Sequence, residues 1–321
     1  MTLLVAKNLQ IQFKTKKGII TAVRDVSFSV ESGETLGVVG ESGCGKSITN
    51  MALMGLLPDN AIVTADTLSF NGVDLLSLNE KGWQDIRGGQ MGMIFQDPMN
   101  SLNPCYTVEQ QINEVLEIHC PEMTKEQRAE KILSLLVDVG IPAPKERLSA
   151  YPHELSGGMS QRVMIAMAIA CNPKLLIADE PTTALDVTVQ QQILELLEKL
   201  QNDHGMSVIF VSHDLSVVKD ITKKIQVMYA GEIIESGITK TIISNPEHPY
   251  TKGLLDSIPS FHDTKDDVLF SIPGLVPDLH SRPKGCQFEG RCFNKKDDCS
   301  SSWPTITQKD DRVLRCHYPL K

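Results

Sequence analysis

Residues G40-E-S-G-C-G-K-S47 match the phosphate-binding loop pattern G-x-x-x-x-G-K-[ST] at every fixed position. Glycines in such a loop let the backbone fold closely around phosphate oxygens. Lys46 is predicted to contact the β- and γ-phosphates of ATP, and the Ser47 hydroxyl to ligate the Mg²⁺ that bridges them. A chance glycine-rich turn is the alternative. The residues expected to contact ATP here are Gly40, Ser42, Gly43, Cys44, Gly45, Lys46, Ser47 and Ile48.

Two acidic residues end the apolar run K174-L-L-I-A-D-E180, which lies well after the phosphate loop in the chain. This pattern is typical of a strand that is buried on both faces and delivers acids to its C-terminal edge. Asp179 is predicted to support Mg²⁺, and Glu180 to polarise the water that attacks the γ-phosphate. A third run, S207-V-I-F-V-S-H213, places His213 at the same edge, where it can donate a hydrogen bond to the γ-phosphate. A plain strand end and a structural histidine are the alternatives.

Ser156, Gly157 and Gly158 stand where a helical pattern begins, ahead of V163-M-I-A-M-A-I-A170. A helix start offers bare backbone N–H groups, and here a serine hydroxyl as well, so this position is suited to an anion. A plain N-cap followed by flexible glycines is the alternative.

The elements that must position these residues follow from the surrounding apolar patterns. L36-G-V-V-G40 predicts a strand before the phosphate loop, and I48-T-N-M-A-L-M-G-L-L57 predicts a helix after it. The free N–H groups and positive dipole end of that helix would face the phosphates. With the two later strands, this predicts an α/β fold around a mainly parallel sheet.

The composition excludes some classes of protein. The formal net charge is −9 and the pI about 5.4, so we do not expect a protein that binds the phosphate backbone of DNA or RNA through a basic surface. The longest uncharged apolar run, 163–171, is too short for a membrane span, and residues 1–6 are too short for a signal peptide. We therefore expect a cytoplasmic chain.

Eight cysteines divide into two groups. Cys44, Cys105, Cys120 and Cys171 are scattered and are interpreted as small apolar residues or idle thiols. The other four lie near the end of the chain and are Cys286, Cys292, Cys299 and Cys316. Disulfides between them are disfavoured, because the cytoplasm expected for this chain is reducing. Their spacing favours a metal or cluster site without naming the metal, because no C-x₂-C pair is present, and idle thiols are the alternative.

The segment L155-S-G-G-M-S-Q161, ahead of a strand ending in Asp-Glu, resembles the signature of ATP-binding cassette proteins. The other family elements follow the same order: Gln96 in M93-I-F-Q-D-P98 for the Q-loop, A184-L-D186 for the D-loop, and His213 for the switch histidine. The resemblance implies that Gln96 joins Ser47 as an Mg²⁺ ligand and that Phe13 stacks on adenine. It also implies that the signature acts on ATP held by a partner chain; its residues are Ser156, Gly157, Gly158 and Gln161, with Asp186 in the D-loop.

The segment N245-P-E-H-P-Y-T-K-G-L-L255 resembles the start of the C-terminal extension of oligopeptide, dipeptide and nickel importer ATPases. The likeness is greatest to the dipeptide-importer ATPases, and it is carried by residues 93–108, 164–187 and 316–320. The implied organisation is a cassette over residues 1–245, with a helical subdomain over about 99–172, and a small cysteine-rich extension over 246–321. The resemblance further implies a [4Fe-4S] cluster on the four C-terminal cysteines, with Zn²⁺ as the alternative.

The implied function is that of an ATPase, a translocase that energises uptake of dipeptides or short oligopeptides. Its implied partners are a second, different ATPase chain, two transmembrane permease subunits and an extracytoplasmic peptide-binding protein, at the cytoplasmic face of the bacterial inner membrane. Two other classes stay open: a soluble cassette protein that remodels DNA or ribosomes, and an iron–sulfur redox protein. The first usually has two cassettes or a long helical insertion, and the second needs neither Glu180 nor His213.

Overall fold

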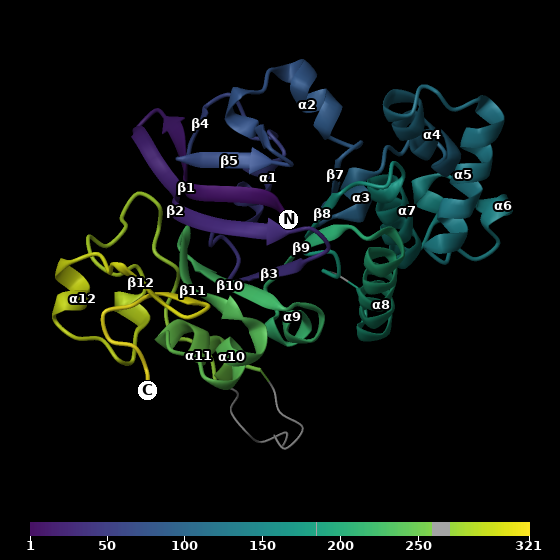
Figure 1. Ribbon diagram of the computed structural model, residues 1–321. Coiled ribbons are helices and arrows are strands. Elements are labelled where there is room, and N and C mark those ends of the chain that lie inside the picture. Colours follow the sequence, from purple (N-terminus) through teal and green to yellow (C-terminus); the bar gives the residue numbers. More distant parts are fainter. Residues whose placement is uncertain (184, 259–269) are drawn as a thin grey trace. The chain divides into compact units, whose positions relative to one another are not determined.

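The computed structural model describes residues 1–183, 185–258 and 270–321, apart from the side chain of Met99 (Figure 1). The chain forms two units. Unit 1 consists of Met1–Val30, Thr35–Leu76 and Val211–Lys321, and unit 2 of Glu31–Glu34 and Ser77–Phe210. Sheets with helices in both units confirm the predicted α/β class.

One sheet of unit 1 is built from the N-terminal part of the chain. Its long strands β1 (Thr2–Thr15) and β2 (Gly18–Glu31) are joined by a tight turn, and the strand order is β2-β1-β5-β6. The strand β4 (Ala61–Thr64) pairs antiparallel with β1 and places Ala61 opposite Phe13. The remaining strands are β5 (Thr67–Phe70) and β6 (Val73–Asp74), followed by the short turn η1 (Leu75–Ser77).

A second sheet carries the phosphate loop, and within unit 1 its order is β12-β13-β11-β10-β3. The strand β3 (Thr35–Val39) runs parallel to β10 (Lys224–Tyr229), and β11 (Glu232–Ile238) returns antiparallel beside β10. The C-terminal hairpin of β12 (Ile306–Lys309) and β13 (Arg312–Arg315) continues the sheet, because β13 pairs with β11.

Helices of unit 1 are short. The phosphate loop leads into α1, and the others follow the later strands or lie in the C-terminal segment. They are α1 (Lys46–Leu53), α9 (Leu215–Ile221), α10 (Thr239–Ser244), α11 (Pro249–Asp256), η3 (Glu289–Arg291) and α12 (Asp298–Ser301).

Unit 2 contains the parallel strands β7 (Met91–Ile94) and β8 (Leu175–Asp179), in the order β9-β8-β7. The strand β9 (Ser207–Ser212) has its last two residues in unit 1. Every residue of these three strands is buried, which explains why their sequences are continuously apolar and do not alternate.

The helices of unit 2 occupy most of the range predicted for a helical subdomain. Figure 1 shows α4, α5, α6 and α7 side by side. Both α4 and α5 begin with a capping box in which a threonine and a glutamine satisfy each other's backbone N–H groups. The helices are α2 (Glu80–Ile86), α3 (Pro98–Ser101), α4 (Val108–His119), α5 (Lys125–Asp138), α6 (Pro144–Arg147), η2 (Pro152–Glu154), α7 (Gly157–Ile169) and α8 (Val187–His204). The predicted division at residue 245 stays a prediction.

Candidate functional site

The phosphate loop lies between β3 and α1 and packs against the turn between β10 and β11. A Cβ at Gly40 would lie 2.2 Å from the carbonyl oxygen of Met228, so only glycine fits there. Gly45 has a φ of 107°, which also favours glycine. The Gly231 N–H donates to the Cys44 carbonyl at 2.7 Å. The loop is therefore anchored to its own sheet.

Lys46 points into this loop and is 5% exposed. Its Nζ donates to the carbonyls of Gly40 at 2.7 Å and Glu41 at 3.1 Å, and contacts Cys44 Sγ at 3.7 Å. Cys44 is buried, and burial raises the pKa of its thiol. An ammonium, the half-buried Ser47 hydroxyl and the N-terminus of α1 are the donor set that fits a nucleotide phosphate with Mg²⁺. Ser42 and Gly43 are exposed, and Ile48 is half-buried.

In unit 2, the structure brings the predicted Q-loop residue to the predicted base. Gln96 Nε2 donates to Glu180 Oε2 at 3.0 Å, and the Thr183 hydroxyl donates to the same oxygen at 3.0 Å. Glu180 is 7% exposed and has a φ of 49°, an uncommon conformation for a non-glycine residue. Asp179 ends β8 and is 4% exposed. The sequence motifs did not identify Thr183 as a site residue. Its position three residues after Glu180 is the only local sign that its hydroxyl could reach that carboxylate.

The predicted signature residues begin α7. Ser156 is the N-cap, and its hydroxyl accepts a hydrogen bond from the Met159 N–H at 3.3 Å. Gly157 and Gly158 form the first turn, and a Cβ at Gly158 would lie 3.0 Å from Val189 of α8. Gln161 follows on the same helix and is 2% exposed.

Asp186 caps α8, because its carboxylate accepts from the Val189 N–H at 2.9 Å. Together with the Gly158 contact, this places the predicted D-loop aspartate and the signature helix beside each other within unit 2. Ala184, also part of the predicted D-loop, lies outside the described residues.

The other two predicted nucleotide contacts belong to unit 1. His213 follows the end of β9 and is exposed, and Phe13 is half-buried in β1. The phosphate loop also belongs to unit 1, whereas the acids and the signature belong to unit 2. The roles of all these residues stay predictions.

The predicted [4Fe-4S] cluster, and zinc as its alternative, are wrong. In residues 1–183, 185–258 and 270–321, no three His, Cys, Asp or Glu side chains form a group that could hold a metal ion. Burial raises the pKa of Cys286 to about 12 and that of Cys316 to about 11, and it also raises the pKa of Cys292. Closeness along the chain did not bring these cysteines into a group with metal-ligand geometry.

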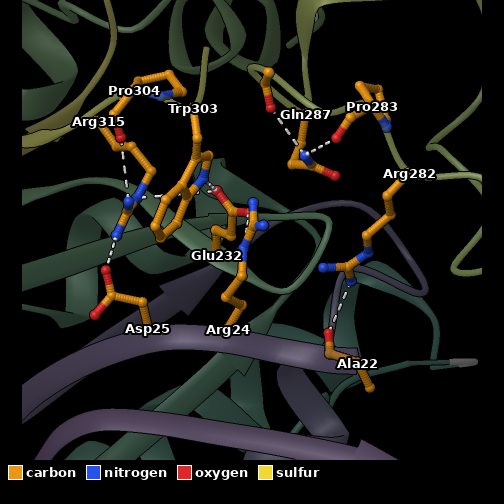
Figure 2. A network of polar contacts seen from close by, with 11 residues as sticks. Ala22, Arg24, Asp25, Glu232, Arg282, Pro283, Gln287, Trp303, Pro304 and Arg315 are labelled. Carbon is orange, nitrogen blue, oxygen red and sulfur yellow. Dashed lines mark hydrogen bonds and ion pairs between the residues drawn. The ribbon is translucent and has the colours of Figure 1, made fainter. Parts of the chain in front are cut away.

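Polar contacts, not metal bonds, attach the tail, meaning the described residues of 246–321, to the two sheets of unit 1 (Figure 2). The guanidinium carbons of Arg24 and Arg315 lie 4.0 Å and 4.2 Å from the centroid of the Trp303 ring. Trp303 Nε1 donates to Glu232 at 2.9 Å, and Arg24 Nε donates to the same carboxylate at 2.9 Å. Arg315 Nη2 donates to Asp25 at 2.6 Å. We call these five residues the tryptophan network.

Two further contacts in Figure 2 fix the segment before the hairpin. Arg282 Nη2 donates to the Ala22 carbonyl at 3.0 Å, and Gln287 Nε2 donates to the Pro283 carbonyl at 3.0 Å. Together with the tryptophan network, the Arg282 contact attaches this segment to β2 and β11.

Comparisons with known proteins match both parts of the chain. The ABC transporter family matches residues 23–183, and the oligopeptide/dipeptide transporter C-terminal region matches residues 234–299. The dipeptide transport ATP-binding protein DppD of Escherichia coli (strain K12) is 49% identical over 321 residues, covering 100% of this chain and 98% of that protein. The oligopeptide transport ATP-binding protein OppD of Bacillus subtilis (strain 168) is 51% identical over 315 residues, covering 98% and 88%.

A solved structure supports the fold. It is the dimeric ATP-binding cassette MJ0796 in a post-hydrolysis state with ADP and Pi, at a TM-score of 0.64 and 29% identity, covering 74% of this chain and 98% of that one. Among the described residues, no helix combines the length and apolarity that a bilayer crossing requires. The family matches and the full-length relatives confirm the resemblance drawn from the motifs: the chain belongs to the ABC transporter family and is one of its ATP-hydrolysing cassettes.

Proposed function

We propose that this chain is the ATPase subunit of an importer that takes up dipeptides or short oligopeptides through separate permease subunits. The observation that carries the proposal is the full-length likeness to proteins named for dipeptide and oligopeptide transport, including the C-terminal region at residues 234–299. In this proposal, residues 1–245 form the cassette, with a helical subdomain over about 99–172, and residues 246–321 form the extension.

The phosphate loop and Lys46 hold the ATP phosphates, and Phe13 contacts the adenine. Ser47 and Gln96 are the residues that would ligate Mg²⁺, supported by Asp179, and the ion would supply positive charge to neutralise the phosphates when bound. Glu180 accepts a proton from the attacking water or orients that water. The Gln96 amide and the Thr183 hydroxyl orient the Glu180 carboxylate, which is the contact that motivates this assignment. His213 donates a hydrogen bond to the γ-phosphate.

The start of α7 acts on a second nucleotide. Ser156 and the first turn of α7 offer N–H groups to the γ-phosphate of ATP held by a partner cassette, with Gln161 and Asp186 supporting the shared surface. One chain thus contributes halves of two sites, and we propose that the partner is a different ATPase chain.

The other proposed partners are two transmembrane permease subunits and an extracytoplasmic peptide-binding protein, with this chain at the cytoplasmic face of the bacterial inner membrane. The helical subdomain near the Q-loop would contact the permease. A net charge of −9 disfavours nucleic acid as a partner.

Purification of the complex from detergent-extracted membranes through a tag on this chain tests the proposal. Mass spectrometry should find two hydrophobic subunits and a second cassette, and the complex in proteoliposomes should take up labelled dipeptide only with ATP and the binding protein. The Glu180→Gln complex is the matched control without uptake. Recovery of ribosomes or DNA in place of the hydrophobic subunits would favour a remodelling cassette and overturn the importer.

A further inference from the structure

The second residue of the phosphate loop, Glu41, is held at three points. Its carboxylate accepts two hydrogen bonds from Arg291, Nη1 to Oε2 at 2.7 Å and Nη2 to Oε1 at 3.0 Å. Its backbone N–H donates to the Tyr250 hydroxyl at 2.9 Å. Its carbonyl accepts from Lys46 Nζ at 3.1 Å. One residue therefore connects the loop lysine to two residues of the C-terminal segment.

Arg291 presents a fixed charge to Glu41. Its side chain is 8% exposed, Nε donates to the Pro273 carbonyl at 2.9 Å, and Nη2 also donates to the Ile272 carbonyl at 3.2 Å. The guanidinium carbon lies 5.8 Å from the ring centroid of Tyr229. A planar guanidinium held in this way meets a carboxylate through two parallel bonds, which sets orientation as well as attraction.

The Tyr250 hydroxyl is also fixed. Its ring is fully buried and packs against Tyr229, with centroids 4.7 Å apart, and against Phe288, with centroids 5.3 Å apart. His248 accepts the Tyr250 backbone N–H at Nδ1 at 3.0 Å and so fixes the start of α11. The phenol oxygen thus reaches the Glu41 N–H from a rigid support.

These contacts differ from the other attachments of the tail. The tryptophan network joins the tail to β2 and β11 and includes no residue of the phosphate loop. The Arg291 and Tyr250 contacts instead reach the residue whose carbonyl binds the Lys46 ammonium. Contacts that served only to attach the tail could have been made elsewhere on unit 1, away from the phosphate loop.

We propose that Arg291 and Tyr250 are positioning residues of the ATPase, which hold Glu41 so that the phosphate loop and Lys46 are preorganised for ATP. A glycine-rich loop loses much conformational freedom when it orders around a ligand. Holding the loop beforehand lowers that cost and strengthens binding without a new contact to the nucleotide. The inference rests on the ATPase activity and does not depend on which solute the importer carries.

Binding of ATP to the full chain, measured by calorimetry with Mg²⁺, tests the inference. Glu41→Gln and Arg291→Gln should each raise the Kd for ATP about tenfold, which corresponds to about 1.4 kcal/mol. The double variant should be no weaker than either single variant, because both remove the same interaction. The rise in Kd should exceed the fall in kcat at saturating ATP, since the loop can still order once nucleotide is bound.

Asp25→Asn is the matched control, because it makes the same carboxylate-to-amide change at a partner of another tail arginine, Arg315. Its Kd for ATP should stay within about twofold of the unchanged chain. Tyr250→Phe keeps the buried ring and removes only the hydroxyl, so misfolding would not explain a change in this variant. Its Kd for ATP should rise about threefold. An unchanged Kd in Glu41→Gln, or an equal rise in Asp25→Asn, would overturn the inference.

Discussion

The amide of Gln96 donates a hydrogen bond to the carboxylate of Glu180 at 3.0 Å, although the two residues stand 84 positions apart in the chain. The contact joins the second residue after β7 to the first residue after β8, and these strands are parallel neighbours. Their C-terminal ends meet at one edge of the sheet, so the two side chains converge.

Glu180→Gln keeps the shape of this contact and removes the carboxylate. Hydrolysis should fall by about 10²–10⁴-fold, because a positioned base contributes about that much, while ATP still binds the phosphate loop. Phosphate release and nucleotide binding measure the two effects. Glu195→Gln makes the same change at an exposed site on α8 and should leave both unchanged. Hydrolysis that survived in Glu180→Gln would remove Glu180 from its proposed role.

Thr183→Val removes the second donor to Glu180 and preserves the volume of the side chain. A hydrogen bond to a charged group contributes about 1.5–3 kcal/mol, so kcat should fall about tenfold or more. Thr183→Ser restores the hydroxyl and should recover most of the rate. If the serine variant were as slow as the valine variant, packing and not the hydrogen bond would explain the loss.

Ser156→Arg places a long cation at the start of α7. In the proposed dimer it should prevent closure over the partner's ATP and lower hydrolysis there by more than about tenfold, while ATP still binds Lys46 of the mutant chain. Assembling the mutant with a normal partner and identifying the trapped nucleotide separates the two sites. Ser149→Arg is the control, an exposed serine elsewhere in unit 2. Loss of ATP from the mutant chain's own loop would contradict a shared site.

His248 predicts a pH dependence of stability. Complete burial lowers the pKa of His248 to about 3, against about 6.5 when the chain is unfolded. Between these values the unfolded chain binds a proton that the folded chain does not, so the free energy of unfolding falls as the pH falls. The loss is about 1.4 kcal/mol per pH unit below about pH 6.5.

His248→Asn keeps an N-cap acceptor for α11 and removes this titration. Urea unfolding at pH 7, 6 and 5 should therefore show a shallower loss of stability in the variant. The buried Glu235, whose carboxylate accepts from the His248 backbone N–H, is present in both chains, so the difference between them isolates the imidazole. Parallel pH profiles would show that His248 does not titrate on unfolding.

Glu232→Gln removes the central anion of the tryptophan network and leaves Arg24 and Arg315 facing each other across Trp303. Arg24 and Asp25 are about a third exposed, so solvent screens the charges, and we expect the free energy of unfolding of unit 1 to fall by about 2 kcal/mol. Added salt should narrow this deficit by screening the two arginines.

The chain has two tryptophans, so emission of Trp303 in a Trp83→Phe background reports unfolding at the network. Asp256→Asn, in an exposed pair with Lys252, is the control and should change stability by less than about 0.5 kcal/mol. A deficit that widened with salt would contradict the charge-repulsion argument.

Local signals explain which parts of the site the sequence could predict. The phosphate loop, the acids after β8 and the N-cap of α7 each depend on a few neighbouring residues, so their patterns are visible in the sequence. The pairing of β13 with β11 is not, because two short strands far apart in the chain carry no sign of their partner. The cysteines misled because nearness in sequence does not orient side chains.

Trp303 is a second example of a residue whose partners the sequence could not predict. Its indole contacts depend on Arg24, Glu232 and Arg315, which come from three strands far apart in the chain. No pattern within the tail could indicate that a tryptophan between two arginines would replace a metal as its anchor.

The division of the chain between the two units has a consequence for the order of folding. Unit 2 is almost one continuous stretch, Ser77–Phe210, whereas unit 1 needs residues as far apart as Asp25 and Arg315, which are 290 positions apart. Closing such a long loop costs entropy before the contact is gained, so assembly dominated by distant pairs is slow. The backbone amides of unit 2 should therefore become protected from hydrogen exchange before those of the paired strands β11 and β13. The slow step of refolding should be the docking of the tail on unit 1.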